Sequence, residues 1–545
     1  MCPARRATAL FVCLVAGLGV ASLAPAQSSD NTQALFNEHC VVCHGAFAEG
    51  GSAPDLTNPQ WQAQRTDEEL ASAIARGVSE TAMPGFAAKI DSAGRDSLVA
   101  LIRGFAIYKD LLYLTTLDAH LVALEAPTGR VRWDVELGKP EDNLNTKQPP
   151  LVIGDKLFIG TAGGDRPSRG FIDAYRAETG ERLWRFYTVP GPGKPGHETW
   201  SADTWKTGGA APWMHGSYDA ELDLIYWSVG QPFPVYDGDA RKGDNLYSNS
   251  VVALEPETGK LKWHYQFTPN GVWDYDGVTE NIPVTIEHEG RLRKVIIHAD
   301  RNGHFYAIDR TNGEFLFAKP FVQVNWADGF TPEGRPIINP AAIPSYEGVD
   351  VCPGAAGGKQ WTGMAYSQLT HLAYLPVIEN CATFYSFGVK AKEQGLPPGP
   401  SGFKYLPGKA FGKVMAIDPN NGNKVWEVKT RSPMSASMLA TAGGLVFTGD
   451  AEGNLLAYDD RNADLLWSFQ TGSDIRTGPV TYRLDGVQYI AVASGMGGAV
   501  GGYTRPGAPW LRNYRSGGTF FVFRLFEPGA SKQLHGGAEQ NPPTN

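Results

Sequence analysis

The sequence predicts a mainly β protein, organised as a β-propeller and preceded by a small all-α domain. Its composition, with 64 Gly, 38 Pro and 14 Trp, favours many short strands and turns over long helices. A hairpin phrase recurs along most of the chain, and a CxxCH motif stands near its start. These two signals indicate two modules of different secondary structure.

The composition is also that of a globular protein larger than one ordinary domain. The chain has 545 residues, of which 42% are hydrophobic and 19% charged. The net charge is −9, and no run of Lys or Arg interrupts the sequence. We therefore expect no nucleic acid and no anionic membrane surface among its partners.

Residues 1–26 have the pattern of a secretory signal peptide. Arg5 and Arg6 precede an apolar stretch that ends at the small-x-small pattern of Ala24 to Ala26. A transmembrane anchor is the alternative, but the stretch is short for a membrane span. The sequence therefore predicts an exported, periplasmic protein without a stable membrane anchor.

A Cys-Val-Val-Cys-His motif indicates covalent attachment of haem. Cys40 and Cys43 can form thioethers with the haem vinyl groups, and His44 can ligate the iron. A redox CxxC or half of a zinc site is the alternative, but no second CxxC follows. Met83, in a Met-Pro-Gly-Phe loop, offers the sixth iron ligand. The alternative is that Met83 is a buried structural methionine that does not bind iron. Residues 27–102 thus resemble a class I cytochrome c carrying haem c.

The hairpin phrase recurs between residues 103 and 527. Each copy combines an alternating strand, a turn of the form D/E-x-x-x-G and a second strand that ends in an aromatic residue. A solenoid or sandwich is the alternative, but neither explains an aromatic at the same place in each unit. The repeat predicts propeller blades, because one unit cannot bury both of its faces alone. The closing aromatic residues are Trp133, Trp184, Trp263, Phe317, Trp426 and Trp467.

Segments between the hairpins resemble a known family. They read ETWSADTWKTGGAAPW (198–213), TPNGVWDYDGV (268–278), HADRNGHFYAIDRTNG (298–313) and CPGAAGGKQW (352–361). These segments are similar to those of the quinoprotein alcohol dehydrogenases, the methanol and ethanol dehydrogenases built on an eight-bladed propeller. The resemblance implies an alcohol substrate, the cofactor PQQ, a Ca²⁺ or lanthanide ion, and a soluble electron acceptor such as a cytochrome c or a small copper protein.

The resemblance also implies a catalytic pair. Oxidation of an alcohol through a quinone needs a base for the hydroxyl proton and a cation that polarises the quinone carbonyl. The family's base falls on Asp274 of the WDYD segment, and its cation falls on Arg301 of DRNG. Without the resemblance, an Asp in such a loop would usually be a solvated turn residue, and a lone Arg a surface charge.

A metal site is implied beside this pair. Asp165 and Gln231 occupy places where relatives have Glu and Asn, and Asp274 with Asp276 would complete the ligands. In the family a carboxylate at the place of Asp276 marks lanthanide-using members, and three negative charges suit a trivalent ion. If the stretch is extended, both aspartates point the same way. The alternative is that Asp276 is solvated or paired with a nearby Arg.

The remaining site residues also follow from the resemblance. Trp205 would stack against PQQ, Arg103 would bind one of its carboxylates, and the glycines would let the backbone approach closely. Cys352 and Cys381 suit a structural disulfide in an oxidising compartment, and their spacing matches a disulfide of the family. The cofactor-binding residues are Arg103, Gly163, Gly164, Trp205, Lys359 and Trp361.

The sequence departs from the family at its N-terminal end. Residues 27–102 lead straight into the segment that contains Arg103, so one N-terminal blade of the propeller is missing, with a PQQ-binding Glu. Residues 528–545 are expected to form a flexible tail.

The N-terminal position of the cytochrome is similar to the domain order of polyvinyl alcohol dehydrogenases, which makes large or polymeric secondary alcohols the alternative substrates. A non-catalytic binding scaffold is the alternative from another class. The missing blade favours a scaffold, whereas the haem motif and the catalytic pair argue against it.

Overall fold

The computed structural model describes residues 106–484, 487–495, 508–513 and 518–524. The predicted signal peptide, cytochrome segment and tail therefore lie outside the described residues. Across the described ranges the regular secondary structure consists of antiparallel sheets, six of them four-stranded, and of short helices. No helix in these ranges is long and apolar enough to cross a membrane.

Four sheets form the first half of the described chain, and each consists of four consecutive strands in sequence order. This order is that of up-and-down propeller blades, so the predicted architecture is confirmed in this half. The strands are β1 (Ala106–Tyr108), β2 (Leu111–Thr115), β3 (His120–Glu125), β4 (Val131–Glu136), β5 (Leu151–Ile153), β6 (Lys156–Gly160), β7 (Phe171–Arg176), β8 (Arg182–Tyr187), β9 (Ser217–Asp219), β10 (Leu224–Val229), β11 (Ser250–Leu254), β12 (Leu261–Gln266), β13 (Ile282–His288), β14 (Arg291–Ala299), β15 (His304–Asp309) and β16 (Phe315–Pro320).

Two more four-stranded sheets and a three-stranded one follow, with small sheets inserted between them. β20, β21, β24 and β25 form the fifth blade, β26 to β29 the sixth, and β30 to β32 the last. The strands are β17 (Ala327–Phe330), β18 (Pro336–Ile338), β19 (Val349–Val351), β20 (Ala365–Tyr366), β21 (Ala373–Glu379), β22 (Ala382–Tyr385), β23 (Gly402–Tyr405), β24 (Phe411–Asp418), β25 (Asn423–Thr430), β26 (Leu439–Ala440), β27 (Leu445–Gly449), β28 (Asn454–Asp459), β29 (Leu465–Gln470), β30 (Val480–Leu484), β31 (Val487–Gly495) and β32 (Gly518–Arg524).

The helices are short and lie in the connections between strands. Most are single 3-10 turns, so the described chain is as poor in helix as its composition predicts. They are η1 (Pro140–Asp142), η2 (His197–Thr199), η3 (Thr204–Thr207), η4 (Gly238–Arg241), η5 (Pro340–Ala342), α6 (Val389–Glu393) and η6 (Pro509–Asn513).

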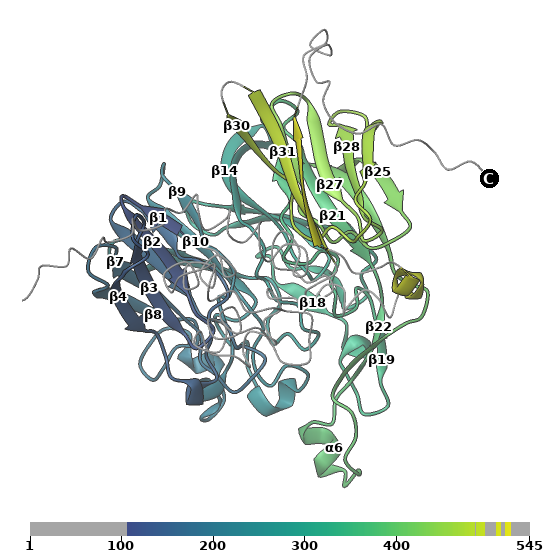
Figure 1. Ribbon diagram of the computed structural model, residues 1–545. Helices are drawn as coiled ribbons and strands as arrows, with labels where there is room; N and C mark the ends of the chain where they lie inside the picture. Colours follow the sequence, from purple (N-terminus) through teal and green to yellow (C-terminus); the bar gives the residue numbers. More distant parts are fainter. Residues whose placement is uncertain (1–105, 485–486, 496–507, 514–517, 525–545) are drawn as a thin grey trace, which may run out of the picture.

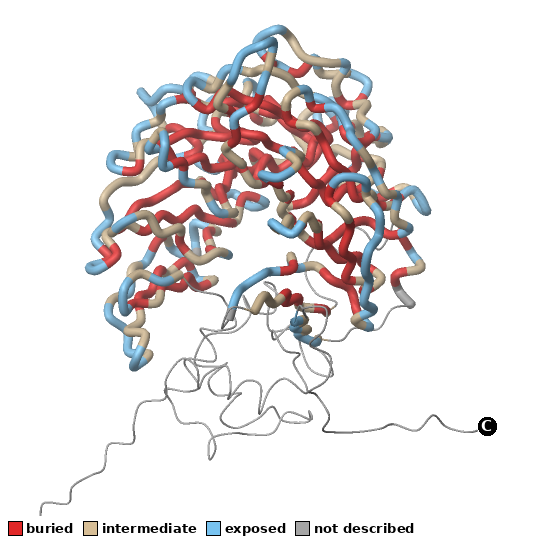
Figure 2. The backbone as a smooth tube through the Cα atoms, turned by 90° about the horizontal axis from the view of Figure 1, so that it is seen from above, coloured by how far each residue is buried: buried red, intermediate tan, exposed pale blue. Residues whose placement is uncertain are grey.

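The blades follow one another around a common centre (Figure 1). In Figure 2 the described chain forms an open arc rather than a closed ring. Seven blades are present in the described ranges, one fewer than the eight of the family that the sequence resembles. This number agrees with the predicted loss of one N-terminal blade.

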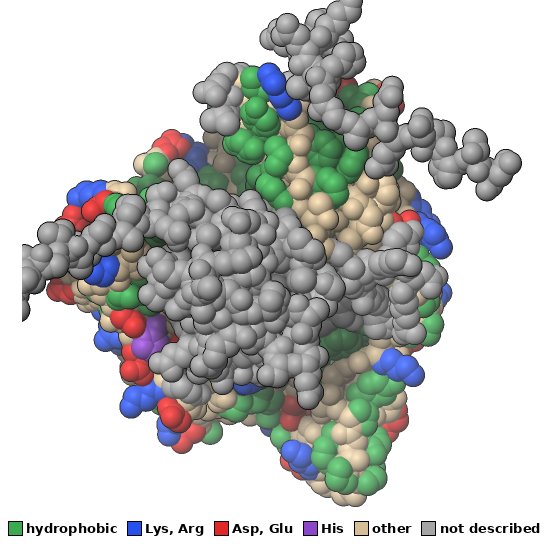
Figure 3. Space-filling model, in the orientation of Figure 1, with side chains coloured by type: hydrophobic (Ala, Val, Ile, Leu, Met, Phe, Trp, Pro, Cys, Tyr) green, Lys and Arg blue, Asp and Glu red, His purple; other side chains and the backbone are tan. Residues whose placement is uncertain are grey.

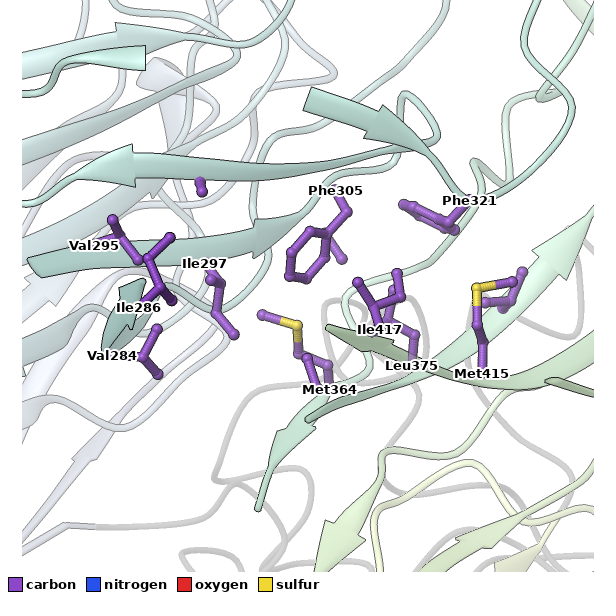
Figure 4. Close-up of a cluster of buried hydrophobic side chains, with 14 of the residues drawn as sticks. Val284, Ile286, Val295, Ile297, Phe305, Phe321, Met364, Leu375, Met415 and Ile417 are labelled. Carbon is purple, nitrogen blue, oxygen red and sulfur yellow. The ribbon is translucent and has the colours of Figure 1, made fainter. Parts of the chain in front are cut away.

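Buried side chains fill the spaces between neighbouring blades. The largest such cluster joins the fourth blade to the fifth: Val295 and Ile297 of β14 lie in it together with Leu375 of β21 and Met415 of β24 (Figure 4). All four side chains are almost completely inaccessible. Burial of this apolar surface is the main term that holds adjacent blades together.

The recurring aromatic residue joins each blade to the next. In six blades it lies opposite an alanine of the neighbouring strand, and the register shifts directly after that alanine. The indole Nε1 of Trp263 donates a hydrogen bond to the carbonyl of Arg310 in the following blade, at 3.1 Å. The turn glycine of that blade, Gly313, has φ +81, and a Cβ there would lie 2.8 Å from the Trp263 ring. Position 313 therefore needs glycine for backbone shape and for contact with the indole, whereas the sixth blade has Ala463 at the matching place, with φ +67.

We expect Trp263→Phe to lower the free energy of unfolding by about 1–2 kcal/mol. The substitution removes the hydrogen bond to Arg310 from a buried interface and leaves a buried carbonyl without that donor. Trp467→Phe is the matched control, because the Trp467 side chain is 38% exposed, and it should cost less than about 0.5 kcal/mol. Urea unfolding of both variants measures the difference, and equal losses would contradict this role of the indole.

Candidate active site

The segment Trp273 to Asp276 lies in the connection between β12 and β13 and presents both predicted aspartates. Neighbouring rings anchor it, since Trp273 Nε1 donates to the Ala342 carbonyl at 2.7 Å and the Tyr275 hydroxyl to the Pro353 carbonyl at 2.5 Å. Asp274 has φ +62, in the left-handed region, which Asp adopts more readily than most residues. The segment is thus a loop and not the extended stretch that would align Asp274 with Asp276.

Arg301 nevertheless brings the two carboxylates to one place. It begins the turn between β14 and β15, and its Nη1 lies 3.1 Å from Asp276 Oδ2. Its Nη2 lies 3.5 Å from Asp274 Oδ2 and donates to the Ala355 carbonyl at 2.5 Å. All three charged side chains are buried. The predicted catalytic pair, Asp274 and Arg301, is therefore in contact, and Asp276 shares its guanidinium.

Two further predicted residues adjoin Asp276. The backbone N–H of Gln231 donates to Asp276 Oδ1 at 2.9 Å, and Gln231 Nε2 donates to Asp165 Oδ1 at 2.5 Å. Trp213, which the sequence did not single out, donates from Nε1 to Asp276 Oδ2 at 3.2 Å. Asp165, Gln231, Asp274 and Asp276 thus form one connected group through hydrogen bonds and Arg301.

The site has more negative than positive charge. Asp274 and Asp276 are buried and share a single guanidinium, that of Arg301, and the exposed Asp165 adds a third negative charge nearby. Burial, and then the charges of the other two aspartates, raise the pKa of Asp274 well above its usual value, although Arg301 opposes the shift. Burial raises the pKa of Asp276 to about 6, again against Arg301. Two buried carboxylates that share one guanidinium, with a third carboxylate nearby, leave negative charge that a hard cation can neutralise.

The described ranges do not, however, contain a ready-made metal centre. No three carboxylate, imidazole or thiol side chains within them are grouped closely enough to hold an ion. The physical reason at this site is that Arg301 lies against both Asp274 and Asp276, where an ion would need to bind. The metal ligands therefore remain a prediction, and a cation would have to compete with the guanidinium.

The segment around the disulfide supports the site from one side. Cys352 and Cys381 are bonded, as predicted. The carbonyls of Pro353 and Ala355, which follow Cys352, accept the hydrogen bonds of Tyr275 and Arg301. The disulfide thus anchors the acceptors that hold the loop of Asp274 and the turn of Arg301.

Lys359 continues this segment and is buried. Its Nζ lies 3.0 Å from Glu280 Oε2, and burial lowers the pKa of Lys359. The backbone of Gly358 donates to the Arg301 carbonyl at 2.9 Å, which places Lys359 beside the catalytic turn. Trp361 is half-buried two residues further on. Glu280, the partner of Lys359, is far from it in the sequence, and no motif marked it.

Trp205 lies in η3 and is half-buried. The guanidinium of Arg169 lies 4.8 Å from its ring centroid, and the Arg169 side chain donates from Nε to the Val189 carbonyl. A cation held over an indole fixes the orientation of the ring, so Arg169 already covers one face of Trp205. The ring also lies edge-on to His197, and Lys206 Nζ is 5.9 Å from its centroid.

The two predicted glycines have a packing role. Gly163 has φ +104, and a Cβ there would lie 2.1 Å from the Asn143 carbonyl oxygen. At Gly164 a Cβ would approach Ala211 to 3.1 Å. Both positions therefore need glycine so that the chain segments around Asp165 can pack closely. Arg103, Cys40, Cys43, His44 and Met83 lie outside the described residues.

Family models match two parts of the chain. Residues 135–325 and 408–490 match the model of the glucose/ethanol/alcohol dehydrogenase β-propeller domain. Residues 27–102 match the model of cytochrome c oxidase, cbb3-type, subunit III. The quinoprotein alcohol dehydrogenase PedH of Pseudomonas putida is 40% identical over 449 residues, which are 78% of this chain and 75% of that protein. The chain belongs to the quinoprotein alcohol dehydrogenase family.

Other family members agree in sequence and structure. The quinohemoprotein alcohol dehydrogenase of Comamonas testosteroni is 39% identical over 425 residues, which are 73% of this chain and 60% of that protein. Its crystal structure aligns with a TM-score of 0.69 over 80% of this chain and 68% of that chain. A europium-containing methanol dehydrogenase aligns with the same TM-score, at 32% identity, over 78% of this chain and 81% of that chain. These findings confirm the predicted family and fold of this quinoprotein.

Proposed function

We propose that this quinoprotein oxidises alcohols to aldehydes or ketones with PQQ and haem c as its cofactors. The observation that carries the proposal is the contact of Asp274 with Arg301 in a buried site of a PQQ-family propeller. The cytochrome match over residues 27–102 supports a haem in the same chain. When bound, PQQ supplies a two-electron acceptor for the alcohol, and haem c supplies a one-electron relay to an external carrier.

The side chains have separate roles in this proposal. Asp274 takes the hydroxyl proton of the alcohol on a carboxylate oxygen, as a general base. Arg301 directs its guanidinium N–H groups at the site and polarises the acceptor carbonyl, which places positive charge where negative charge develops. Trp205 and Arg103 would hold the flat ring system and a carboxylate of PQQ. Burial of Asp274 and Arg301 excludes water from the proton transfer.

A metal ion at this site would need its donor set to rearrange, since the described side chains are not grouped as metal ligands. The family's metal would be held by carboxylate oxygens of Asp165, Asp274 and Asp276 and by the amide oxygen of Gln231. Because Asp274 and Asp276 share the single guanidinium of Arg301, a hard cation would relieve the remaining negative charge. Calcium or a lanthanide supplies this charge, and a trivalent ion supplies more of it.

We expect La³⁺ to give more activity than Ca²⁺ when the protein is reconstituted with PQQ. The reason is the third carboxylate, Asp276, whose pKa is raised to about 6 in the absence of a cation. Asp276→Ala should reverse the preference, because it removes one negative charge from the site. Equal or greater activity of the unmodified protein with Ca²⁺ would argue for a calcium enzyme and leave Asp276 as the partner of Arg301.

The whole proposal is tested by one reconstitution. Purified protein is loaded with PQQ and either Ca²⁺ or La³⁺, an alcohol is added, and the haem absorption band is followed. We expect alcohol-dependent reduction of the haem, which should not occur when PQQ is omitted. A haem band that stays oxidised with every primary and secondary alcohol offered would contradict the proposal.

The proposal extends to location and partners. Residues 1–26 would act as a signal peptide, residues 27–102 as the haem module, residues 103–527 as the propeller and residues 528–545 as a tail. The enzyme would work in the periplasm and pass electrons to a soluble carrier such as a cytochrome c or a small copper protein. Fractionation and reoxidation of the haem by such carriers test these points.

A further inference from the structure

Both end blades of the described arc present an apolar face that no described blade covers. In the last blade, β30, β31 and β32 pair so that Val480, Ala491 and Val522 lie in one row. Strand residues two apart share a face, so Tyr482 lies on that face too. The side chains of Val480, Tyr482 and Val522 are 56%, 44% and 47% exposed.

The opposite face of the last blade is the one that packs on its neighbour. Phe521 and Phe523 of β32 contact Phe469 of β29, at ring-centroid distances of 5.3 and 5.0 Å. Ile490 and Val492 of β31 lie in the same buried clusters between the two blades. The exposed face therefore points away from the sixth blade, to where a propeller would place its next blade. Figure 3 shows hydrophobic side chains gathered where Figure 1 places β30 and β31.

The first blade likewise has one face packed on its neighbour and one exposed apolar face. Its packed face carries Tyr113 and Trp133, which lie against the second blade. Its other face carries one row of apolar residues, one from each of the four strands. In strand order, the row is Ile107, Leu112, Leu124 and Val131. Ile107 is 60% exposed and Val131 is 56% exposed. Two apolar sheet faces thus border the opening of the arc, one from each end of the described chain.

The position of residues 27–102 in the chain indicates which segment fills the opening of the arc. The cytochrome match ends at residue 102, and β1 begins at Ala106. The few residues between them span at most roughly 14 Å when fully extended. The segment is therefore tethered to the first blade, beside the opening. The tail after Arg524 is the other part of the chain near it, but the tail is rich in Gly, Pro and polar residues and offers little apolar surface.

We propose that residues 27–102 occupy the place of the missing blade and pack against these two apolar faces of the first and last blades. The exposed side chains that bound this place are Ile107, Val131, Val480, Tyr482 and Val522. Such contacts bury apolar surface that a monomer would otherwise expose to water. The inference goes beyond the proposed alcohol oxidation and does not depend on it. It assigns the haem module a structural role in closing the propeller.

Hydroxyl-radical footprinting of the full-length haem protein tests the proposal without a substitution. Tyr482, which is 44% exposed, should be oxidised at least several-fold more slowly than Tyr218, a matched control that is 37% exposed and lies on β9 of the third blade. Equal rates for Tyr482 and Tyr218 would overturn the proposal, since the face would then be open to water.

Cysteine labelling attributes the protection to one occupant. In Val480→Cys and Val131→Cys a maleimide should react far more slowly than in Leu292→Cys, whose parent side chain is 78% exposed. Protection should persist on dilution and after removal of residues 528–545. Loss of protection on dilution would show that a second copy covers the faces, and loss after truncation would show that the tail does; either result overturns the proposal. None of these readouts needs activity, so failure of the proposed oxidation would leave this test intact.

Discussion

Asp274→Asn should reduce alcohol turnover by roughly 10²- to 10⁴-fold, the range that general base catalysis contributes. The amide keeps the size of the side chain and tolerates the left-handed backbone at φ +62, but it cannot accept the hydroxyl proton. Contact with Arg301 can persist through the amide oxygen, so binding of PQQ should survive. Single-turnover reduction of the haem band after addition of alcohol measures the effect.

Asp223→Asn is the control for this substitution. Asp223 also has a positive φ, of +50, but it is exposed, and it accepts its hydrogen bond from Tyr218 at the surface. Its replacement should leave turnover within about twofold of the unmodified enzyme. If Asp274→Asn behaved like Asp223→Asn, Asp274 would have no part in the proton transfer.

Removal of the disulfide should lower both stability and activity. In the double variant Cys352→Ala, Cys381→Ala, the loop between positions 29 apart is no longer closed in the unfolded chain. The chain-entropy model assigns such a loop about 3–4 kcal/mol. Turnover should also fall, because the Pro353 and Ala355 carbonyls that hold Tyr275 and Arg301 lose their anchor.

Chemical denaturation and turnover of the double variant measure the two effects. Mild reduction of the unmodified protein, under conditions that leave the haem thioethers intact, should reproduce them. The same treatment of the double variant should change nothing further. Loss of stability with full turnover would show that the disulfide holds the fold but not the catalytic loop.

The blades could be predicted because each of their signals acts locally. The turn glycine, the strand alternation and the closing aromatic of one unit lie within a short stretch, and each meets its partner in the next unit. Gly313 is an example, because its positive φ and its contact with Trp263 both follow from the repeat. The sequence therefore contained most of the information needed for the fold.

The site was predicted only in part, because its contacts join loops that are distant in sequence. Asp274 and Arg301 came from a resemblance, and the structure brings them together. The role of Arg301 as common partner of both aspartates, and those of Trp213 and Glu280, depend on how the loops sit on the blades. The condition that the stretch from Asp274 to Asp276 be extended is not met, because Asp274 has φ +62 and the side chains of Trp273 and Tyr275 on either side of it donate to carbonyls of other segments.

The one-way contacts between blades bear on how such a protein can change in evolution. The indole of one blade donates a hydrogen bond to a carbonyl of the following blade, as Trp133 does to Ala177 and Trp184 to Pro256. Each of these blades therefore provides the binding site for the indole of the blade before it. Deletion of an interior unit would remove the carbonyl that accepts the hydrogen bond of the preceding blade's indole, and it would displace the loops that carry Asp274 and Arg301. Loss of the first unit removes one indole, and every remaining indole keeps its acceptor on the following blade. A lineage can therefore shorten such a propeller from its front end and install another domain there while the catalytic loops stay in register.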